Sequence, residues 1–379
     1  MRIDKNTTIR LGDRNIVKVK LGDVVIWQKS TKPEPVVETD YFYIESLGDR
    51  NTISVVNKGD GSTSGATPTL EYSKDKNTWN TITFDWTSGE HTTELPIKLN
   101  TGEKMYFRND TRKFSDSYPK HISFSSSVSS NVGGDIRTLS NYLDVDSETK
   151  PQSYMFSYLF YNNKKIVDAS NLRLPYTTLA ESCYRSMFYG CTSLTTTPKL
   201  PATTLASNCY YSMFYGCTSL TTAPTLPATT LASGCYYEMF RGCYNLTTVT
   251  TELPATTLAS GCYQYMFRGC TSLTTAPALP ATTLASQCYM DMFQDCSKLT
   301  TAPELPSTTL APYCYYYMFN GCTSLSSITV YANDISAPGC TTNWLLGVAS
   351  TGTFRNLGSA TYPTDSTSGI PSGWTEVKK

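Results

Sequence analysis

A seven-residue motif, Leu-Pro-x-Thr-Thr-Leu-Ala, recurs through the second half of the chain and constrains its fold more than any other feature. Successive copies are 26 or 27 residues apart, beginning at Leu174, Leu200, Leu226, Leu253, Leu279 and Leu305. A period of about 20–29 residues with fixed leucines is typical of leucine-rich repeats, in which each period forms one coil of a solenoid. The motif therefore predicts a solenoid over residues 150–350, with terminal caps, and residues 351–379 as a C-terminal cap or tail.

Apolar residues within one repeat predict a short helix. Cys235, Met239 and Cys243 follow one another at intervals of four residues, which would place them on one helical face. Ser233 is a suitable residue for the start of this helix and Gly242 for its end. Fixed prolines make the remainder of each repeat short and extended. The predicted fold class is therefore an α+β repeat.

One position near the end of each predicted helix carries only glycine, asparagine or aspartate. From coil to coil its occupants are Asn162, Gly190, Gly216, Gly242, Gly269, Asp295, Gly321 and Gly347. These residue types best tolerate a backbone with positive φ. We therefore predict positive φ at this position, as in a helix C-cap.

All 13 cysteines lie at two positions of the repeat. Within a repeat the two are eight residues apart, or about 12 Å along a helix, which is too far for a disulfide. Neither histidine, His91 or His121, lies among the repeats, so a zinc site is not expected. We predict reduced, buried cysteines that act as small apolar residues. The alternative is a ladder of disulfides between neighbouring coils.

The first 145 residues have the pattern of β-structure. Residues 1–30 contain Leu-Gly-Asp twice beside alternating apolar residues, which predicts a β-hairpin segment. Residues 31–40 contain Lys-Pro-Glu-Pro and are predicted to be a linker. Residues 41–145 contain several short strand-like runs with polar turns, which predicts a β-sandwich domain.

Composition argues against several classes of function. Lys and Arg together number 31, as do Asp and Glu, so no excess charge attracts nucleic acid. No apolar run approaches the roughly 18 residues that membrane insertion needs. With two histidines and no phosphate-binding loop, we expect no enzyme, no cofactor and no metal site. The alternative is a glycan-active enzyme in the β-sandwich. It would need a cleft with two paired carboxylates, and no sequence motif indicates one.

Some repeat positions vary while their neighbours stay fixed, and such freedom predicts exposure. Tyrosine and arginine are frequent there, and both give large contact areas in recognition surfaces. An ordinary solvated face is the alternative interpretation. The candidate binding residues are Tyr211, Tyr215, Tyr237, Arg241, Tyr265, Arg268, Tyr316 and Tyr317.

The repeat Cys-Tyr-x-x-Met-Phe-x-Gly-Cys-Thr-Ser-Leu-Thr-Thr-Ala-Pro resembles the BspA-like leucine-rich repeats. The resemblance covers residues 150–379, and residues 70–108 resemble the β-domain that often precedes such repeats. This family implies a surface protein of gut Bacteroidetes or of their phages that acts in adhesion or partner binding without an enzyme mechanism. Residues 17–27 are similar to N-terminal segments of phage virion proteins.

From these features we expect a phage virion component, such as a tail, fibre or capsid-decoration protein, that attaches to the host cell surface. The repeats would bind a surface glycan or protein, and the N-terminal segment would bind other virion proteins; a homo-oligomer is also allowed. The absence of a leader after Met1 favours this interpretation over the alternative, a bacterial cell-surface adhesin. The candidate anchor residues are Leu11, Val17, Val19, Leu21, Ile26 and Trp27.

Overall fold

The computed structural model describes residues 18–21, 24–28, 40–59, 69–84, 86, 89–110, 120–143, 145, 149–365 and 367–379. The chain forms two compact units, residues 1–39 and residues 40–379. In the first unit, β1 (Lys18–Leu21) and β2 (Val24–Gln28) form an antiparallel pair in which Leu21 lies opposite Val24.

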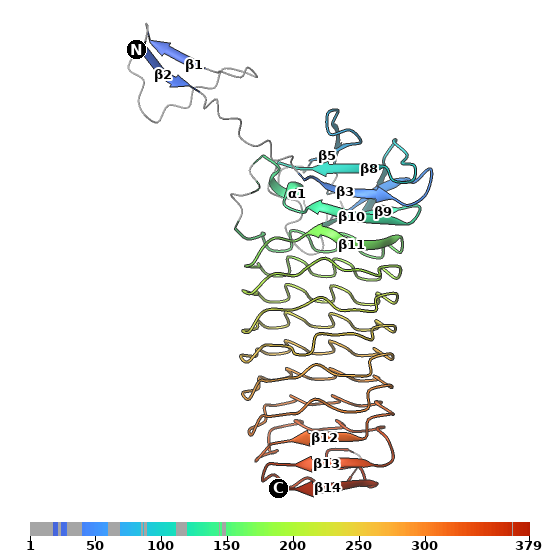
Figure 1. The fold of residues 1–379 in the computed structure, drawn as a ribbon, viewed down its shortest axis with the longest axis vertical. Coiled ribbons are helices and arrows are strands. Elements are labelled where there is room, and N and C mark those ends of the chain that lie inside the picture. The colour runs from blue at the N-terminus through green and yellow to red at the C-terminus, as the bar shows by residue number, and fades with distance from the viewer. Residues whose placement is uncertain are drawn as a thin grey trace. The chain divides into compact units, whose positions relative to one another are not determined.

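The second unit begins with two sheets that contain mostly antiparallel strands (Figure 1). The larger sheet has the strand order β11-β10-β3-β8-β5-β6, and the smaller one has the order β7-β4-β9. A four-residue helix, α1 (Thr138–Asn141), follows β10 and is the one α-helix among the described residues. The strands are β3 (Phe42–Ser46), β4 (Ile53–Gly59), β5 (Thr69–Ser73), β6 (Asn80–Thr83), β7 (Gly89–Glu94), β8 (Lys104–Arg108), β9 (His121–Ser126), β10 (Ser130–Asp135) and β11 (Ile166–Arg173).

Alternating side chains from the two sheets fill a common core. On β3 and β8 every second residue is buried, which is the pattern of a strand with one face turned inward. Phe42 of β3 and Phe107 of β8 meet Phe124 of β9, with ring centroids 5.4 and 4.8 Å apart. Aromatic contacts therefore join the larger sheet to the smaller one.

The two sheets and the first coil of the repeats share one continuous hydrophobic core. β11 belongs to the first coil of the repeats and pairs in parallel with β10. The N–H of Phe124 donates to the carbonyl of Leu159 at 2.8 Å, and the Asn163 amide returns a bond to the Phe124 carbonyl at 3.0 Å. The ring of Phe124 also lies 6.3 Å from that of Phe160. The two sheets thus cover the N-terminal end of the coils.

The repeats form coils stacked one upon another (Figure 1). Parallel bridges join equivalent threonines of neighbouring coils, such as Thr230 with Thr257 and Thr257 with Thr283. Two columns of buried rings run through the stack. One contains phenylalanines with centroids 5.0 to 5.7 Å apart, from Phe160 to Phe319, and the other contains tyrosines 5.6 to 6.2 Å apart, from Tyr184 to Tyr315.

The predicted helix at Cys235–Cys243 is wrong, because this stretch is a ribbon of consecutive turns. Cys235 and Met239 donate to the carbonyls three residues earlier, at 3.2 Å each. Every second N–H group leaves the coil: those of Tyr236 and Phe240 donate to Cys262 and Met266 of the next coil, at 3.0 and 2.9 Å. In an α-helix these donors would bond within their own segment.

A left-handed residue at every fourth position prevents the helix and produces the apolar spacing. φ is +58° at Gly234, +54° at Glu238 and +72° at Gly242. The turn ribbon therefore repeats every four residues, so Cys235 and Met239 share its buried side just as they would share a helical face. Positive φ is confirmed at the glycine position in all eight coils, although no helix ends there.

Three strands close the C-terminal end. β12 (Ser327–Val330), β13 (Gly352–Asn356) and β14 (Trp374–Lys378) form a parallel sheet. Two tryptophans tie this end together, because the indole N–H of Trp344 donates to Gly369 at 3.1 Å and that of Trp374 donates to Ala349 at 2.8 Å. Trp344 also continues the tyrosine column, 6.3 Å from Tyr315.

The cysteines are free and buried, as predicted. The second cysteine of each repeat also forms a hydrogen bond. Its thiol donates to the phenylalanine carbonyl of the preceding coil, at 3.0 to 3.2 Å in all six repeats that have it. Burial raises the pKa of the Cys243 thiol to about 12, so the proton needed for this bond is retained at neutral pH. Val348 occupies the same position in the last coil and has no donor.

Candidate binding surface

The turn ribbon carries the eight candidate binding residues, and all eight are half-buried. Fixed neighbours place them there, because the buried Cys, Tyr, Met and Phe side chains face inward and leave the intervening positions outward. Contacts connect six of the eight into a cluster that we call the tyrosine–arginine face: Tyr211, Tyr215, Tyr237, Arg241, Tyr265 and Arg268. Tyr316 and Tyr317 form a separate pair, with centroids 4.5 Å apart.

Stacking orients the tyrosine rings of this face. Tyr211 and Tyr237 lie 4.6 Å apart at 8° between ring planes, whereas Tyr237 and Tyr265 meet edge to face at 5.3 Å. Tyr215 stacks in the same way on Tyr189 of the preceding coil, at 4.5 Å. Each stacked ring covers part of its neighbour's face, so edges and hydroxyl groups are what remain accessible. The stacked part of the face is therefore suited to hydrogen bonding more than to the stacking of sugar rings.

The arginines of the face are held in place by rings and a carboxylate. The guanidinium carbon of Arg241 lies 5.5 Å from the centre of the Tyr215 ring and 5.6 Å from that of Tyr265. Arg241 also forms an ion pair with Glu238, whose other oxygen accepts a bond from the Ser212 hydroxyl at 3.1 Å. Arg268 lies 5.5 Å from the Tyr265 ring centre. These contacts restrict both guanidinium groups before any partner arrives, which lowers the entropic cost of binding.

The hydroxyl groups of Tyr211 and Tyr237 remain neutral donors. Burial is the largest cause that raises the pKa of Tyr211, and the nearby Glu238 carboxylate raises it further. The pKa of Tyr237 is raised by burial and then by Tyr211. At physiological pH the tyrosine–arginine face therefore offers uncharged hydroxyls beside fixed positive charges.

In the coil that follows Tyr265 and Arg268, a buried acidic residue, Asp291, lies next to the tyrosine–arginine face. It occupies the repeat position that Glu238, Tyr265 and Tyr317 hold in other coils, and it is only 5% exposed. Burial is the largest cause that raises the pKa of its carboxyl to about 6; Arg268 and Arg241 oppose that shift. The carboxylate therefore ionises only against a desolvation cost.

Replacing Asp291 with asparagine should stabilise the protein at neutral pH. The pKa of about 6 in the folded state exceeds the ordinary value of 3.8, so ionisation favours the unfolded state above pH 6. That cost disappears as the pH falls through 6 towards 4, because the folded state then binds the proton. We expect Asp291→Asn to add about 1–2 kcal/mol to the free energy of unfolding at pH 7.5 and close to nothing at pH 4.

Urea denaturation at the two pH values measures this difference, with Asp295→Asn as the control. Asp295 lies in the same coil, is exposed and also has positive φ, +62° against +54° at Asp291. The control therefore has the same backbone preference without the buried charge. An equal gain from both variants, or a gain from Asp291→Asn that does not change with pH, would show that desolvation of Asp291 is not the cause.

The comparison with protein families agrees with this geometry. Residues 153–299 and 240–338 match the BspA type leucine-rich repeat region, in 6 copies. The repeats of this chain belong to the BspA type leucine-rich repeat family. The resemblance stated from the Cys-Tyr and Met-Phe motifs is thereby confirmed, whereas the likeness of residues 17–27 to phage proteins stays a prediction. Neither the curated proteins nor the solved structures gave a match to this chain.

The candidate anchor residues are only partly described. Leu11 and Val17 lie outside the described residues, and Val19, Leu21, Ile26 and Trp27 lie on β1 and β2. Their role as an anchor stays a prediction. No helix among the residues that the structure describes has the length and apolar character for crossing a membrane. Within the same residues, no three His, Cys, Asp or Glu side chains gather to hold a metal ion.

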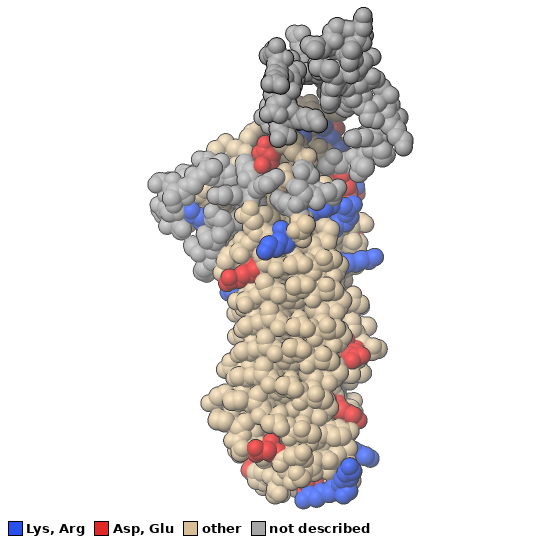
Figure 2. Space-filling model, turned by 90° about the vertical axis from the view of Figure 1, so that its left-hand side faces the viewer, with Lys and Arg blue, Asp and Glu red and all other residues tan. Residues whose placement is uncertain are grey.

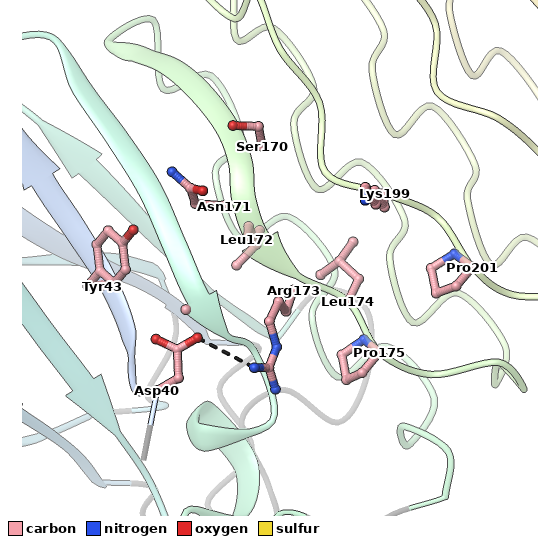
Figure 3. Close-up of a pocket in the computed structure, with 11 residues that line it drawn as sticks. Asp40, Tyr43, Ser170, Asn171, Leu172, Arg173, Leu174, Pro175, Lys199 and Pro201 are labelled. Atoms are coloured by element: carbon pink, nitrogen blue, oxygen red, sulfur yellow. Dashed lines mark ion pairs between the residues drawn. The ribbon is translucent and has the colours of Figure 1, made fainter. Parts of the chain in front are cut away.

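The sequence did not reveal a pocket of about 580 Å³ where the larger sheet meets the first coils (Figure 3). It is lined by Tyr43 of β3, by the end of β11 and, from the next coil, by Lys199 and Pro201. Arg173 and Lys199 hold the same repeat position, directly before the Leu-Pro motif, in neighbouring coils. The sequence therefore indicated that two cations lie close together on neighbouring coils. It did not indicate that the larger sheet lies beside them.

Proposed function

We propose that this BspA type repeat protein is a non-enzymatic binding protein of a phage virion, and that its solenoid displays the tyrosine–arginine face to a host cell surface. The observation that supports it most is the separation within each repeat between fixed, buried residues and variable residues on the surface. Fixed residues form the interior, whereas the variable ones converge on one connected surface with restrained arginines and neutral hydroxyls. A repeat with only a structural role would not need that surface.

The same family match is equally compatible with a bacterial cell-surface adhesin. The virion interpretation is favoured by residues 1–39, which form a compact unit of their own and contain the β1–β2 hairpin. A two-stranded hairpin is marginal when isolated and has unpaired edges, so it suits the addition of strands to a neighbouring virion protein.

Peptide mass spectrometry of density-purified phage particles, with the host envelope fraction analysed alongside, tests this assignment. A virion component should be recovered from the particles in a fixed ratio to the other virion proteins. Recovery from the envelope alone would contradict it and favour the adhesin. Both outcomes leave the binding role of the repeats to a separate measurement.

That measurement replaces four residues of the face with residues that the same positions carry in other coils. The variant is Tyr237→Gln, Arg241→Gln, Tyr265→Ser and Arg268→Gln, which copies Gln264, Gln294, Ser212 and Gln294 in that order. We expect at least a 30-fold loss of binding of the labelled protein to intact target bacteria, since hot-spot residues each contribute roughly 2 kcal/mol or more. The melting temperature should change little, because the replacements are native to the repeat.

A second variant, Thr221→Ser with Thr247→Ser, provides the control. Both threonines are exposed on the extended part of the coil, where a later repeat already carries Ser326. This control should bind like the wild type. If the four-residue variant also binds like the wild type, the tyrosine–arginine face is not the contact surface.

A further inference from the structure

The pocket beside the first two coils has the size of a small-molecule site and is open to solvent. Its volume of about 580 Å³ lies in the usual range of such sites, about 300–1,000 Å³. Tyr43 and the end of β11, with Ser170 and Asn171, lie on one side, and Lys199 and Pro201 lie on the other (Figure 3). It belongs to the extended part of the coils, so it is separate from the turn ribbon that carries the tyrosine–arginine face.

Arg173 lines the pocket, and a buried carboxylate fixes its guanidinium group. Asp135, with a side chain 4% exposed, accepts a bond from Arg173 at 2.6 Å. Arg137 donates to the same carboxylate oxygen, at 2.7 Å through its Nη2. Two arginines therefore share one buried negative charge. Two further carboxylates lie nearby. Asp40 has an oxygen 3.6 Å from Arg173, beyond hydrogen-bond distance, and its side chain is half exposed. Asp168 lies next to Ser170 and accepts a bond from its hydroxyl at 3.0 Å.

Lys199 adds a second positive charge one coil further along. It is exposed, and no ion pair of Lys199 is found among the described residues. The same repeat position changes to Thr225, Glu252, Ala278 and Glu304 in the following coils, so the pair of cations occurs only beside the sheet. Charged side chains are sparse over the coils in Figure 2, which makes two adjacent cations unusual for this surface.

The remaining lining is suited to a sugar ring. Pro175 and Pro201 present small apolar surfaces from neighbouring coils, over the buried Leu174. Ser170, Asn171 and the Tyr43 hydroxyl supply polar groups at the opposite wall. The Ser170 hydroxyl already donates to Asp168 at 3.0 Å, so its oxygen is left as an acceptor for a ligand hydroxyl. A small apolar area with a few placed polar groups is the usual make-up of a ligand site.

We propose that this pocket binds a carboxylate-bearing sugar, with the carboxylate between Arg173 and Lys199 and the ring against Pro175 and Pro201. Among the residues that line the pocket, Arg173 and Lys199 are positive and Asp40 is negative. Their charges sum to one positive charge, which an acidic sugar neutralises and a neutral sugar does not. The site goes beyond the proposed attachment function, because it requires neither the tyrosine–arginine face nor a virion.

Isothermal titration calorimetry of the full-length protein at low ionic strength tests the proposal with two matched probes. D-glucuronate and D-glucose have the same ring and differ in the carboxylate alone. We expect a dissociation constant of about 1 mM for glucuronate, typical for a ligand of this size, and at least tenfold weaker binding of glucose. Equal affinities, or no glucuronate binding at 20-fold that concentration (~20 mM), would overturn it.

Two variants that copy residues from other coils locate the bound sugar. Lys199→Thr adopts the residue of the next coil, Thr225, and should weaken glucuronate binding about tenfold, the loss of one charge-assisted contact. Lys298→Ser removes an equally exposed lysine from a position that carries Ser219 and Ser272 in other coils, and it should change nothing. An unchanged affinity in Lys199→Thr would also overturn the proposal. A glucuronate oligosaccharide that binds more tightly than the monosaccharide would identify the source as a polysaccharide chain, whereas equal affinity would identify a terminal or free sugar.

Discussion

Phe240→Ala should lower the free energy of unfolding by about 3–5 kcal/mol. The Phe240 side chain is fully buried in the middle of the phenylalanine column, 5.6 Å from Phe214 and 5.7 Å from Phe267. Truncation removes the apolar surface of one ring and both stacking contacts, and the neighbouring coils cannot close the gap because their backbone spacing is set by hydrogen bonds. Denaturant unfolding monitored by circular dichroism measures the loss.

Tyr244→Ala in the same coil is the control for this substitution. Tyr244 is also aromatic, but it is 54% exposed. Its removal should change the free energy of unfolding by no more than about 0.5 kcal/mol. A loss below 1 kcal/mol for Phe240→Ala would mean that the column contributes much less to stability than its burial implies.

Gly134→Ala should cost about 3 kcal/mol or more, at the junction of the sheets with the coils. Gly134 has φ of +81°, and a Cβ there would lie 2.0 Å from the Tyr41 carbonyl oxygen. That neighbour is backbone, so β10 or β3 would have to shift. β10 also pairs with β11 of the first coil, and the shift would therefore reach the repeats.

Gly102 separates the two contributions to this cost. It has the same φ of +81°, but a Cβ at Gly102 would meet nothing within 4 Å. Gly102→Ala should therefore show the cost of the left-handed backbone alone, about 1–2 kcal/mol. If the two variants prove equally destabilised in the same denaturant experiment, the close approach to Tyr41 is not the source of the difference.

The interior of the repeats was predictable because the chain solves one packing problem several times. The cysteines, Met239 and Phe240 recur at fixed intervals, and the structure buries them. Positive φ at the glycine position followed from residue type, since Asn162 and Asp295 replace glycine there. Those features depend on local chemistry, which a sequence displays directly.

The helix was mispredicted because two structures share the same apolar spacing. A helix and a ribbon of four-residue turns both place Cys235 and Met239 on one side, and only the destination of the backbone donors distinguishes them. The ribbon also has positive φ at Glu238 and at its equivalents in other coils, Ser212 and Asp291. Serine, glutamate and tyrosine are not residue types that favour a left-handed backbone. Residue type at this position therefore gave no reason to reject a helix.

The candidate binding surface was located by sequence, but its chemistry was not. Variability at Tyr211 and Tyr237 pointed to an outward position, which the structure agrees with only in part because both rings are half-buried. Their stacking and the ion pair of Arg241 with Glu238 join residues of different repeats or turns, so they require the stack itself. The pocket at Arg173 and Lys199 also needs β3 and β10, which are distant in sequence.

Along the turn ribbon every coil bonds to the next in the same way, with the donor in one and the acceptor in its successor, as from Tyr210 to Cys235 and from Tyr236 to Cys262. A coil is therefore an interchangeable segment whose upper and lower edges are complementary. Unequal crossing-over within the gene could insert or delete whole segments of 26 or 27 residues without creating a mismatched edge. Each such event would change the reach of the protein by about 4.8 Å, the spacing of hydrogen-bonded strands. The length of the repeat stack would then depend on the number of repeat copies in the gene. The sheets and the two cation-bearing coils beside them would stay constant.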